Sequence, residues 1–414
     1  MLILLALLPA CAPVDGKLEG SADSFACGPG THEEDGQCVV DDADTDTDTD
    51  SDTDTDTDSD TDTDTDTDSD TDTDTDVAPD YTVCADGVAP YDDLQDAIDA
   101  ANDGDVIYVC AGTYDRVEID QLEVTLVGDG ADTTVIDGGR RTALYVTDSS
   151  IVMSGFGLTG GADGASEETL AGALYFIYST FEVADLRVFG CEGDGGGYGV
   201  VQKESTSSWD DVVFEGNSVS SAFIAVTGGE VTMRNAVFTG NGPLPANGYG
   251  GQALYLEADR YEVSNILVYA NEAGFDTDVV DLRAGDEGWL YNAVVHGNVG
   301  GGEALSASGG TTVIENCIVS ENTGANGVAT SNGAVVRYTD SYGNEANFSP
   351  EASSQPDNFS SNPRFTDPDA GDFHLDPGFS PAIDQGNPLA GYNDADGTRN
   401  DLGAFGGPYG GWSP

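Results

Sequence analysis

Asn235-Ala-Val-Phe-Thr-Gly-Asn241 is the stretch that decides the fold, because it recurs along the chain. The further copies run from Asn265 to Asn271, from Asn292 to Asn298 and from Asn316 to Asn322, and looser copies start at Gly155, Asp185, Asp211 and Asp340. The first residues of these copies, here called anchors, are 24 to 30 residues apart. A period of this size predicts stacked supersecondary units rather than a closed globule.

Apolar residues alternate on either side of each anchor, which is the periodicity of a β-strand. The anchors are Asn, Asp or Gly, the residues that accept left-handed backbone and form turns. The apolar side chains two places before the anchors should therefore form a core row, as should those one and three places after them. The anchors, and Asn217, Asn241, Asn271, Asn298 and Asn322 six places further on, are expected to form amide ladders. The residues two places before the anchors are Met153, Val183, Trp209, Met233, Val263, Leu290, Ile314 and Tyr338.

These repeats resemble the right-handed parallel β-helix of the pectin-lyase-like superfamily, over roughly residues 91–348. The resemblance implies an all-β, single-stranded solenoid domain at 77–348. Its entry segment also fits, with Asp103–Cys110 and Gly112–Tyr114 as first strands. Before them, Leu94–Ala101 should be a short capping helix with Leu94, Ala97, Ile98 and Ala101 on one face. This architecture carries lyases, hydrolases, esterases, adhesins and scaffolds, so it does not identify a function.

The first residues of the chain resemble a bacterial lipoprotein signal. Met1–Ala10 is an apolar run that ends in Leu-Pro-Ala before Cys11. The interpretation is a signal with a lipidated cysteine at 1–11 and a short tether at 12–42, with Ala12 directing the protein to the outer membrane and cell surface. The run is short and lacks a basic residue, so a secretory peptide with a coincidental Cys11 is the alternative.

Six cysteines remain if Cys11 carries lipid, and an oxidising compartment favours disulfides between them. Cys27 and Cys38 bracket a small loop, which a disulfide is expected to close. Cys84 and Cys110 flank the expected capping helix and should form a second bond. Cys317 falls on a core row and is expected to be a buried thiol.

Acidic residues dominate both the linker and the folded part. Residues 43–76 alternate Thr or Ser with Asp and should form an extended, disordered spacer. Val77–Pro414 carries 52 acidic and 11 basic residues, a net charge of −41. This charge disfavours nucleic acid and anionic membranes as partners, so membrane contact is expected only through the lipid anchor. The acidity fits either salt tolerance or divalent cations.

A candidate glycan-binding face lies on the strands before the anchors. Residues one and three places before an anchor should point outward, and Trp289 and Tyr291 are both in such positions. Exposed aromatic rings beside carboxylates and a guanidinium suit contact with sugar rings. The alternative is that a loop or the chain end covers the rings. The polar candidates on this face are Arg234, Glu262, Glu315 and Asp210.

A second outward row, two places after the anchors, is apolar and needs a cover. Soluble proteins rarely leave such a stripe exposed, so the chain after Gly343 is expected to lie on it. Residues 349–414 are interpreted as a capping segment, and Ser380–Gly386 and Asn393–Gly407 resemble a terminal module that follows β-helix repeats in bacterial surface proteins. The row is Val213, Val237, Leu267, Val294 and Ile318.

A calcium site is the one cofactor that the residues suggest. Asp394, Asp396 and Asp401 surround a glycine turn in the terminal region, and a hard cation prefers several oxygen ligands in a flexible loop. The alternative is that Asp394 and Asp396 make only hydrogen bonds within the turn and that Asp401 pairs with an arginine such as Arg399.

The motifs of the enzymes with this fold are absent, which favours a non-catalytic function. The chain has three histidines and a single lysine after residue 77, Lys203, so a His-metal site or a Ser-His-Asp triad is poorly supported. The leading interpretation is a monomeric surface protein that binds polysaccharide or serves surface structure and adhesion. The alternatives are a diverged polysaccharide lyase or glycoside hydrolase, and a purely structural solenoid.

Overall fold

The computed structural model describes residues 31–34, 37–40, 78–162, 171–193, 197–244, 250–309 and 311–414. In the first unit of the chain, Met1–Asp74, the described part is the antiparallel hairpin of β1 (Thr31–Glu34) and β2 (Gln37–Val40). Cys11, Cys27 and the 43–76 linker lie outside the described residues, as does the side chain of Cys38, so lipidation, the Cys27–Cys38 bond and the disordered spacer stay predictions.

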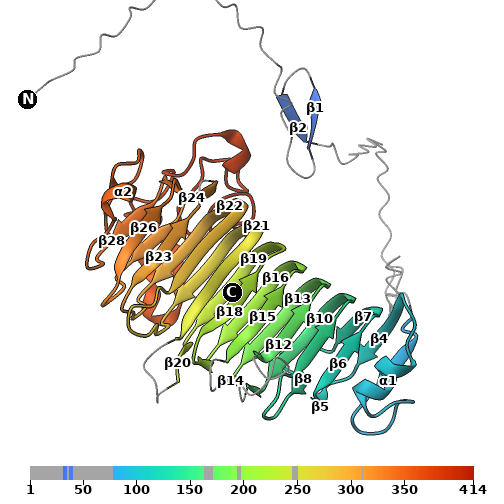
Figure 1. Cartoon of the computed structure of the whole chain (residues 1–414). Helices are drawn as coiled ribbons and strands as arrows, with labels where there is room; N and C mark the ends of the chain where they lie inside the picture. The colour runs from blue at the N-terminus through green and yellow to red at the C-terminus, as the bar shows by residue number, and fades with distance from the viewer. Residues whose placement is uncertain are drawn as a thin grey trace, which may run out of the picture. The chain divides into compact units, whose positions relative to one another are not determined.

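The second unit, Thr75–Pro414, is an all-β solenoid of parallel strands, which confirms the predicted β-helix (Figure 1). Each coil pairs in register with the coils before and after it. Three kinds of strand follow one another in a coil: one before the anchor, one after it, and a third on the remaining side. Several strands continue through the anchor, and β21 and β22 run through all three sides.

The strands that form the first coils and the short lateral sheet are β3 (Tyr81–Val83), β4 (Asp105–Val109), β5 (Gly112–Asp115), β6 (Val117–Asp120), β7 (Glu123–Gly128), β8 (Thr134–Asp137), β9 (Leu144–Thr147), β10 (Ser150–Thr159), β11 (Gly161–Ala162), β12 (Ala171–Ile177), β13 (Thr180–Phe189), β14 (Glu192–Gly193), β15 (Tyr198–Lys203), β16 (Thr206–Glu215), β17 (Ser218–Val219), β18 (Ala222–Thr227), β19 (Glu230–Thr239) and β20 (Gly242–Pro243). The later strands of the solenoid are β21 (Gln252–Tyr269), β22 (Val280–His296), β23 (Glu303–Ser308), β24 (Thr312–Glu315), β25 (Ile318–Ser320), β26 (Asn326–Ser331), β27 (Val335–Arg337) and β28 (Asp340–Tyr342). None of the helices in the described ranges is long and apolar enough to cross a membrane.

The predicted core rows are confirmed as one continuous buried cluster. Aromatic rings pack against one another in its centre: Phe181 and Trp209 are tilted with centroids 5.7 Å apart, and Phe214 and Phe238 are stacked at 4.8 Å. Cys317 lies in this core as a free, fully buried thiol, as expected. Each coil contacts only its neighbours, so it buries its apolar side chains against the coils before and after it. This burial is the main source of stability in a solenoid.

The asparagine ladder six places after the anchors is confirmed. In each step the amide nitrogen of one residue donates to the Oδ1 atom of the next, over distances of 2.8 to 3.0 Å. The same oxygen also accepts the backbone N–H of the preceding ladder residue. The ladder therefore satisfies buried backbone groups at a corner of the solenoid, and its members are Asn217, Asn241, Asn271, Asn298, Asn322 and Asn344.

The anchors take left-handed backbone, with φ between 45° at Asp185 and 75° at Gly155. The expectation for the last coil is wrong, because Tyr338 (φ 50°) takes the left-handed position there and Asp340 pairs with Ile318 instead. Asp340 is therefore in the row two places after the anchor. The last coil is shorter than the others, and an aspartate that favours turns falls two residues beyond the turn itself.

The predicted capping helix closes the first end of the solenoid as α1 (Leu94–Ala100). Asp93 accepts the backbone N–H of Gln95 as its N-cap, and Leu94, Ala97 and Ile98 are buried in the core. The predicted Cys84–Cys110 disulfide is present and joins the chain segment before this helix to the segment after it.

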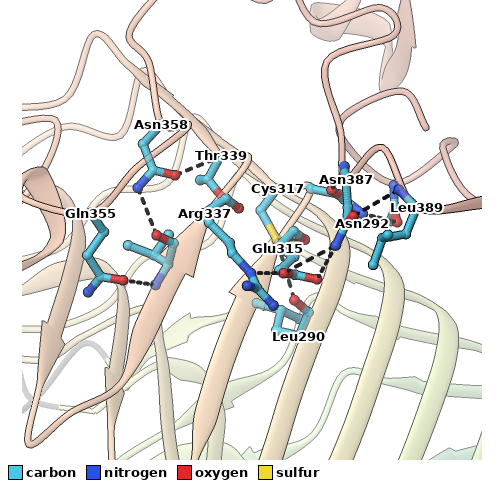
Figure 2. A network of polar contacts seen from close by, with 12 residues as sticks. Leu290, Asn292, Glu315, Cys317, Arg337, Thr339, Gln355, Asn358, Asn387 and Leu389 are labelled. Carbon is cyan, nitrogen blue, oxygen red and sulfur yellow. Dashed lines mark hydrogen bonds and ion pairs between the residues drawn. The ribbon is translucent and has the colours of Figure 1, made fainter. Parts of the chain in front are cut away.

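The other end is closed by residues 348–358, which include α2 (Pro350–Ser353). Ala352 is buried against the core, and Phe348 packs on it. Gln355 and Asn358 accept the backbone N–H groups of Val336 and Thr339, over 2.7 and 3.1 Å (Figure 2). These side chains stand in for the missing next coil, so the open strand edge of β27 does not remain unpaired.

Residues 359–412, here called the C-terminal segment, cover the apolar stripe as predicted. They bury Val237, Leu267, Val294 and Ile318, while Val213 is only partly covered. The buried apolar side chains of the cover are Phe373, Ala382, Leu402 and Ala404. Phe379, also in this segment, is 72% exposed and takes no part in the cover. The regular elements of the segment are β29 (Phe365–Asp367), η2 (Pro368–Ala370), β30 (Asp372–Leu375) and η3 (Ala390–Tyr392).

Candidate functional site

The side of the solenoid that carries the third strand of each coil presents a row of outward side chains, here called the tyrosine face. In these strands Leu144, Leu174 and Leu254 point into the core, so the next residue points outward. The pairing of the strands places these outward residues side by side from coil to coil. In order they are Tyr145, Tyr175, Val201, Ala225, Tyr255, Asp281 and Ser306.

Each tyrosine of this row has a cationic side chain at its ring. Tyr145 and Tyr175 stack with centroids 5.0 Å apart, and the Nζ atom of Lys203 lies 5.4 Å from the centroid of Tyr175. The guanidinium carbon of Arg116 is 5.8 Å from the Tyr145 centroid, and that of Arg283 is 5.1 Å from the Tyr255 centroid. A domain with few basic residues thus places three of them beside tyrosines on one side, where cation–π contacts hold the rings in fixed orientations.

A pocket of about 400 Å³ lies at one end of the tyrosine face. Its charged centre is Asp281, whose side chain is 9% exposed and receives two hydrogen bonds from Arg283, at 2.6 and 3.2 Å. The hydroxyl of Tyr255 donates to Glu257 and lies 3.5 Å from Arg283. Burial and the Glu257 contact raise the pKa of Tyr255 to about 12, so its hydroxyl stays protonated at neutral pH and acts as a hydrogen-bond donor.

Asp278 and Glu303 provide two carboxyl groups with raised pKa values beside this centre. Asp278 lines the pocket and accepts the Ser306 hydroxyl at 2.6 Å and the backbone N–H of Glu303 at 2.7 Å. Burial raises the pKa of Asp278, and the nearby Asp281 adds to this effect. Burial also raises the pKa of Glu303. The pocket therefore combines a carboxyl that binds its proton more tightly than usual with a second carboxyl group that is paired with an arginine.

Small side chains separate the tyrosines, but the middle of the face is covered: Tyr175, Val201 and Ala225 are 1%, 4% and 8% exposed. Val201 and Ala225 stand between Tyr175 and Tyr255, three coils apart, which is about 14 Å at ordinary strand spacing. The open parts of this face are the half-buried rings of Tyr145 and Tyr255 and the pocket. At Tyr255 and the pocket a ligand can contact a ring, a guanidinium group and carboxylates together. Phe275, three residues before Asp278, is 74% exposed.

The predicted glycan-binding residues lie on another side of the solenoid, on the strands before the anchors. Trp289 is half-buried, with the guanidinium of Arg260 5.2 Å from its ring, and Glu262 lies beside it in register and is exposed. Asp210 and Arg234 form an ion pair at 2.8 Å, and Arg234 also lies over Tyr409. The structure thus places Trp289 with Glu262, and separately Asp210 with Arg234, at the surface.

Tyr291 and Glu315 do not lie on an open face, and the expectation that Glu315 is exposed is wrong. Glu315 is 0% exposed and is bound by Arg337 and, at 3.3 Å, by Asn387 of the C-terminal segment (Figure 2). Tyr291 packs edge-on against Tyr392, with centroids 5.7 Å apart. The outward orientation of both residues was predicted correctly, but a segment distant in sequence lies over them.

Three of the four anchor asparagines hold this segment instead of forming a ladder of their own, while Asn235 donates to Asp210. Asn265 donates to the carbonyl oxygens of Ala404 and Gly406, both at 2.9 Å. Asn292 donates to Asn400 at 3.0 Å, and Asn316 accepts the backbone N–H of Asn387 at 2.8 Å. Asn316 also reaches Asn292 at 3.5 Å, which is the weak remainder of the expected ladder along the axis.

The candidate calcium residues make hydrogen bonds within their turn. Asp394 accepts the backbone N–H groups of Gly407 and Asp401, and Asp396 accepts the hydroxyl and N–H of Thr398. Asp401 accepts the N–H of Asp384 and does not pair with Arg399. In the part of the chain that the structure describes, no three His, Cys, Asp or Glu side chains are grouped to hold a metal ion. Calcium binding stays a prediction.

The tyrosine face was missed in the sequence although it has a signal there. The tripeptide Ala-Leu-Tyr occurs at Ala143–Tyr145, Ala173–Tyr175 and Ala253–Tyr255, with Ala-Leu-Ser at Ala304–Ser306. In each copy the two apolar residues are buried, and the third residue belongs to the outward row. An outward tyrosine at the same place in three coils is a pattern that the repeat alone does not require.

No protein-family model and no curated protein matches this chain. Solved structures do, among them pectate lyase Pel9A at 14% identity and a TM-score of 0.45, covering 78% of this chain and 95% of that chain. An alginate lyase from Paenibacillus sp. str. FPU-7 matches at 14% identity and a TM-score of 0.35, over 68% of this chain and 98% of the other. The A-module of Azotobacter vinelandii mannuronan C-5 epimerase AlgE6 matches at 15% and 0.23, over 65% and 94%. Likeness at this level carries no argument about the chemistry of this chain.

Proposed function

We propose that this chain is a surface protein that binds polysaccharide non-covalently along the tyrosine face. The observation that carries the proposal is the pair of half-buried rings Tyr145 and Tyr255, each with a guanidinium at its ring, in one row with the pocket around Asp281. Sugar rings have apolar faces that stack on aromatic side chains and hydroxyl edges that bind carboxylate and guanidinium groups. Both kinds of partner occur on this face within a few coils.

The arrangement supports an extended ligand more than a compact one. The row follows the axis of the solenoid across seven coils, and the chemistry changes along it from stacked rings to the charged pocket. A polymer can contact several of these places at once, so that individually weak contacts add up without a deep cavity. The net negative charge of the domain opposes a densely anionic polymer, except where Lys203 and Arg283 offset it.

Display at the cell surface belongs to the same proposal. A lipid on Cys11 would anchor the chain in the outer membrane, and the Thr/Asp linker at 43–76 would hold the β-helix away from it, with a reach of up to ~110 Å. The domain would act as a monomer, with no nucleic acid partner. A protein placed in this way would meet polysaccharides outside the cell.

A diverged glycoside hydrolase is the second candidate, because of one observation. Burial raises the pKa of Asp278, while Asp281 in the same pocket is paired with Arg283. Glycoside hydrolases usually use two carboxyl groups whose surroundings give them different pKa values, one as the acid and one as the base or nucleophile. In that case Asp278 would donate the proton, and Asp281, paired with Arg283, would be the second carboxyl group.

The test is a polysaccharide panel scored for both retention and product release, using the full chain. We expect at least one polysaccharide to retard the protein in affinity electrophoresis, and Tyr145→Ala/Tyr255→Ala to lose this retardation. Phe379→Ala removes an exposed ring from the C-terminal segment and is the matched control. Released oligosaccharides that disappear with Asp278→Asn would favour the hydrolase. No retention of any polysaccharide would leave the purely structural solenoid.

A further inference from the structure

The C-terminal segment is attached to the solenoid almost entirely by side chains. Its backbone bonds to the coils only at Phe359, which pairs with Thr339 and Ser341, and at Gly403, which donates to Asn316, within the described residues. Its only strands, β29 and β30, pair with each other. The segment can therefore leave the stripe without breaking any coil of the solenoid.

One carboxyl group lies where the segment meets the last coil. Asp340 continues the row of Val294 and Ile318, so a carboxyl stands in a position that is apolar in the preceding coils. It is 0% exposed, and Phe359 pairs beside it. Its Oδ1 atom accepts the backbone N–H of Ser361 at 2.9 Å, and its Oδ2 atom is buried without a hydrogen-bond partner.

An ionised carboxylate is costly in these surroundings because nothing nearby compensates its charge. On the flanking strands the charged side chains are Arg337 and Glu315, which pair with each other, and in the segment Arg364 is exposed. None of them acts on Asp340, whose only hydrogen-bond donor is the backbone of Ser361. Opening of the segment would return the carboxyl to water, where ionisation costs nothing.

We propose that Asp340 makes the C-terminal segment a pH-dependent latch, which is closed while this carboxyl is protonated and loosens when it ionises. Opening exposes the apolar stripe at Val237, Leu267, Val294 and Ile318. The latch is independent of the proposed glycan site, because the tyrosine face lies on another side of each coil.

The direction of the effect follows from the proton affinity of the two states. Burial raises the pKa of Asp340 to about 7 in the closed state, against about 4 for a carboxyl in water. At pH values between these two pKa values, opening therefore releases a proton. In this pH range the contribution of Asp340 makes the equilibrium constant for opening rise about ten-fold per pH unit. Above pH 7 both states are ionised, and the contribution no longer changes with pH.

His296 is a second titratable group beneath the segment, and its effect has the opposite sign. It packs edge-on against Phe365 and Phe373 and hydrogen-bonds to Ser320. Burial lowers the pKa of His296, so protonation in acid favours the open state. A comparison of variants at each pH removes this contribution, because His296 is present in all of them.

Hydrogen exchange of the full chain tests the latch. The amides of Asn387 and Gly403 both donate to Asn316, so they become exchangeable when the segment leaves. After correction for intrinsic rates, the protection of these amides in Asp340→Asn relative to wild type should rise about ten-fold per pH unit from pH 5 to 7, and then level off. Asp340→Val, which continues the apolar row, should give the same trend.

Asp367→Asn, an exposed position on β29, is the control and should follow wild type throughout. Amides of β19 in the solenoid core should keep the same protection in all variants, since only the segment opens. A ratio of Asp340→Asn to wild type that stays constant between pH 5 and 8 would overturn the proposal. So would a change of equal size in the β19 amides, because it would mean that Asp340 acts on the whole solenoid.

Discussion

Substituting Asn271 with alanine tests what the asparagine ladder contributes to stability. Asn271 is 0% exposed in the middle of the ladder. Its Oδ1 atom accepts the backbone N–H of Asn241 at 3.0 Å, and its amide donates to the carbonyl oxygen of Phe238 at 2.9 Å. Alanine fills neither role, and water cannot easily reach these groups.

The expected cost follows from the groups left without a partner. The amide of Asn241 still has the carbonyl oxygen of Phe214, and the Oδ1 atom of Asn298 still accepts the Asn271 backbone N–H. The backbone N–H of Asn241 and the carbonyl of Phe238 lose the partner that Asn271 provides. A buried polar group without a partner costs about 1–3 kcal/mol, so Asn271→Ala should lower the free energy of unfolding by about 4 kcal/mol.

The assay is urea unfolding of the full chain followed by circular dichroism, with Asn344→Ala as the matched control. Asn344 ends the ladder and is partly exposed, so water can replace much of its amide. We expect it to cost about 1 kcal/mol. If Asn271→Ala costs no more than Asn344→Ala, the ladder does not satisfy the buried corner in the way described.

Three further substitutions test other parts of the molecule. Phe373→Ala should leave a cavity over the apolar stripe and weaken the docking of the C-terminal segment by about 3–5 kcal/mol, seen as faster limited proteolysis there with the solenoid intact. Millimolar Ca²⁺ should raise the melting temperature, and Asp396→Ala should remove the increase; identical melting curves with Ca²⁺ and chelator would exclude the metal. Cys11→Ser should leave the protein in the soluble fraction without acyl mass, and membrane partitioning of this variant would contradict lipidation.

The solenoid could be predicted because its periodicity is local. Each coil repeats the same alternation about its anchor, so residues such as Met233, Val263 and Leu290 could be assigned to one core row without knowledge of the rest of the chain. The same holds for the ladder from Asn217 to Asn322. The apolar stripe indicated that another segment covers it, since a soluble protein rarely exposes five stacked aliphatic side chains.

The candidate site could not be predicted to the same degree, because contacts between distant segments leave no periodic signal. Strand alternation showed that Glu315 points outward, but not that Asn387 lies over it. The anchor asparagines were assigned to a ladder, whereas Asn265 and Asn292 bind the C-terminal segment. The tyrosine row could have been found, since Ala-Leu-Tyr recurs three times, but only with the length of each intervening loop taken into account.

The most direct test of the account is calorimetric titration of a retained polysaccharide into the full chain and two variants. Tyr145→Ala/Tyr255→Ala removes two rings of the tyrosine face, and Trp289→Ala removes a half-buried ring on another side of the solenoid. Loss of a ring that contacts the ligand typically costs more than 1 kcal/mol, and each 1.4 kcal/mol is ten-fold in affinity. We therefore predict at least ten-fold weaker binding for the double tyrosine variant and unchanged binding for Trp289→Ala. Weakened binding for Trp289→Ala with unchanged binding for the tyrosine variant would contradict the tyrosine face as the site.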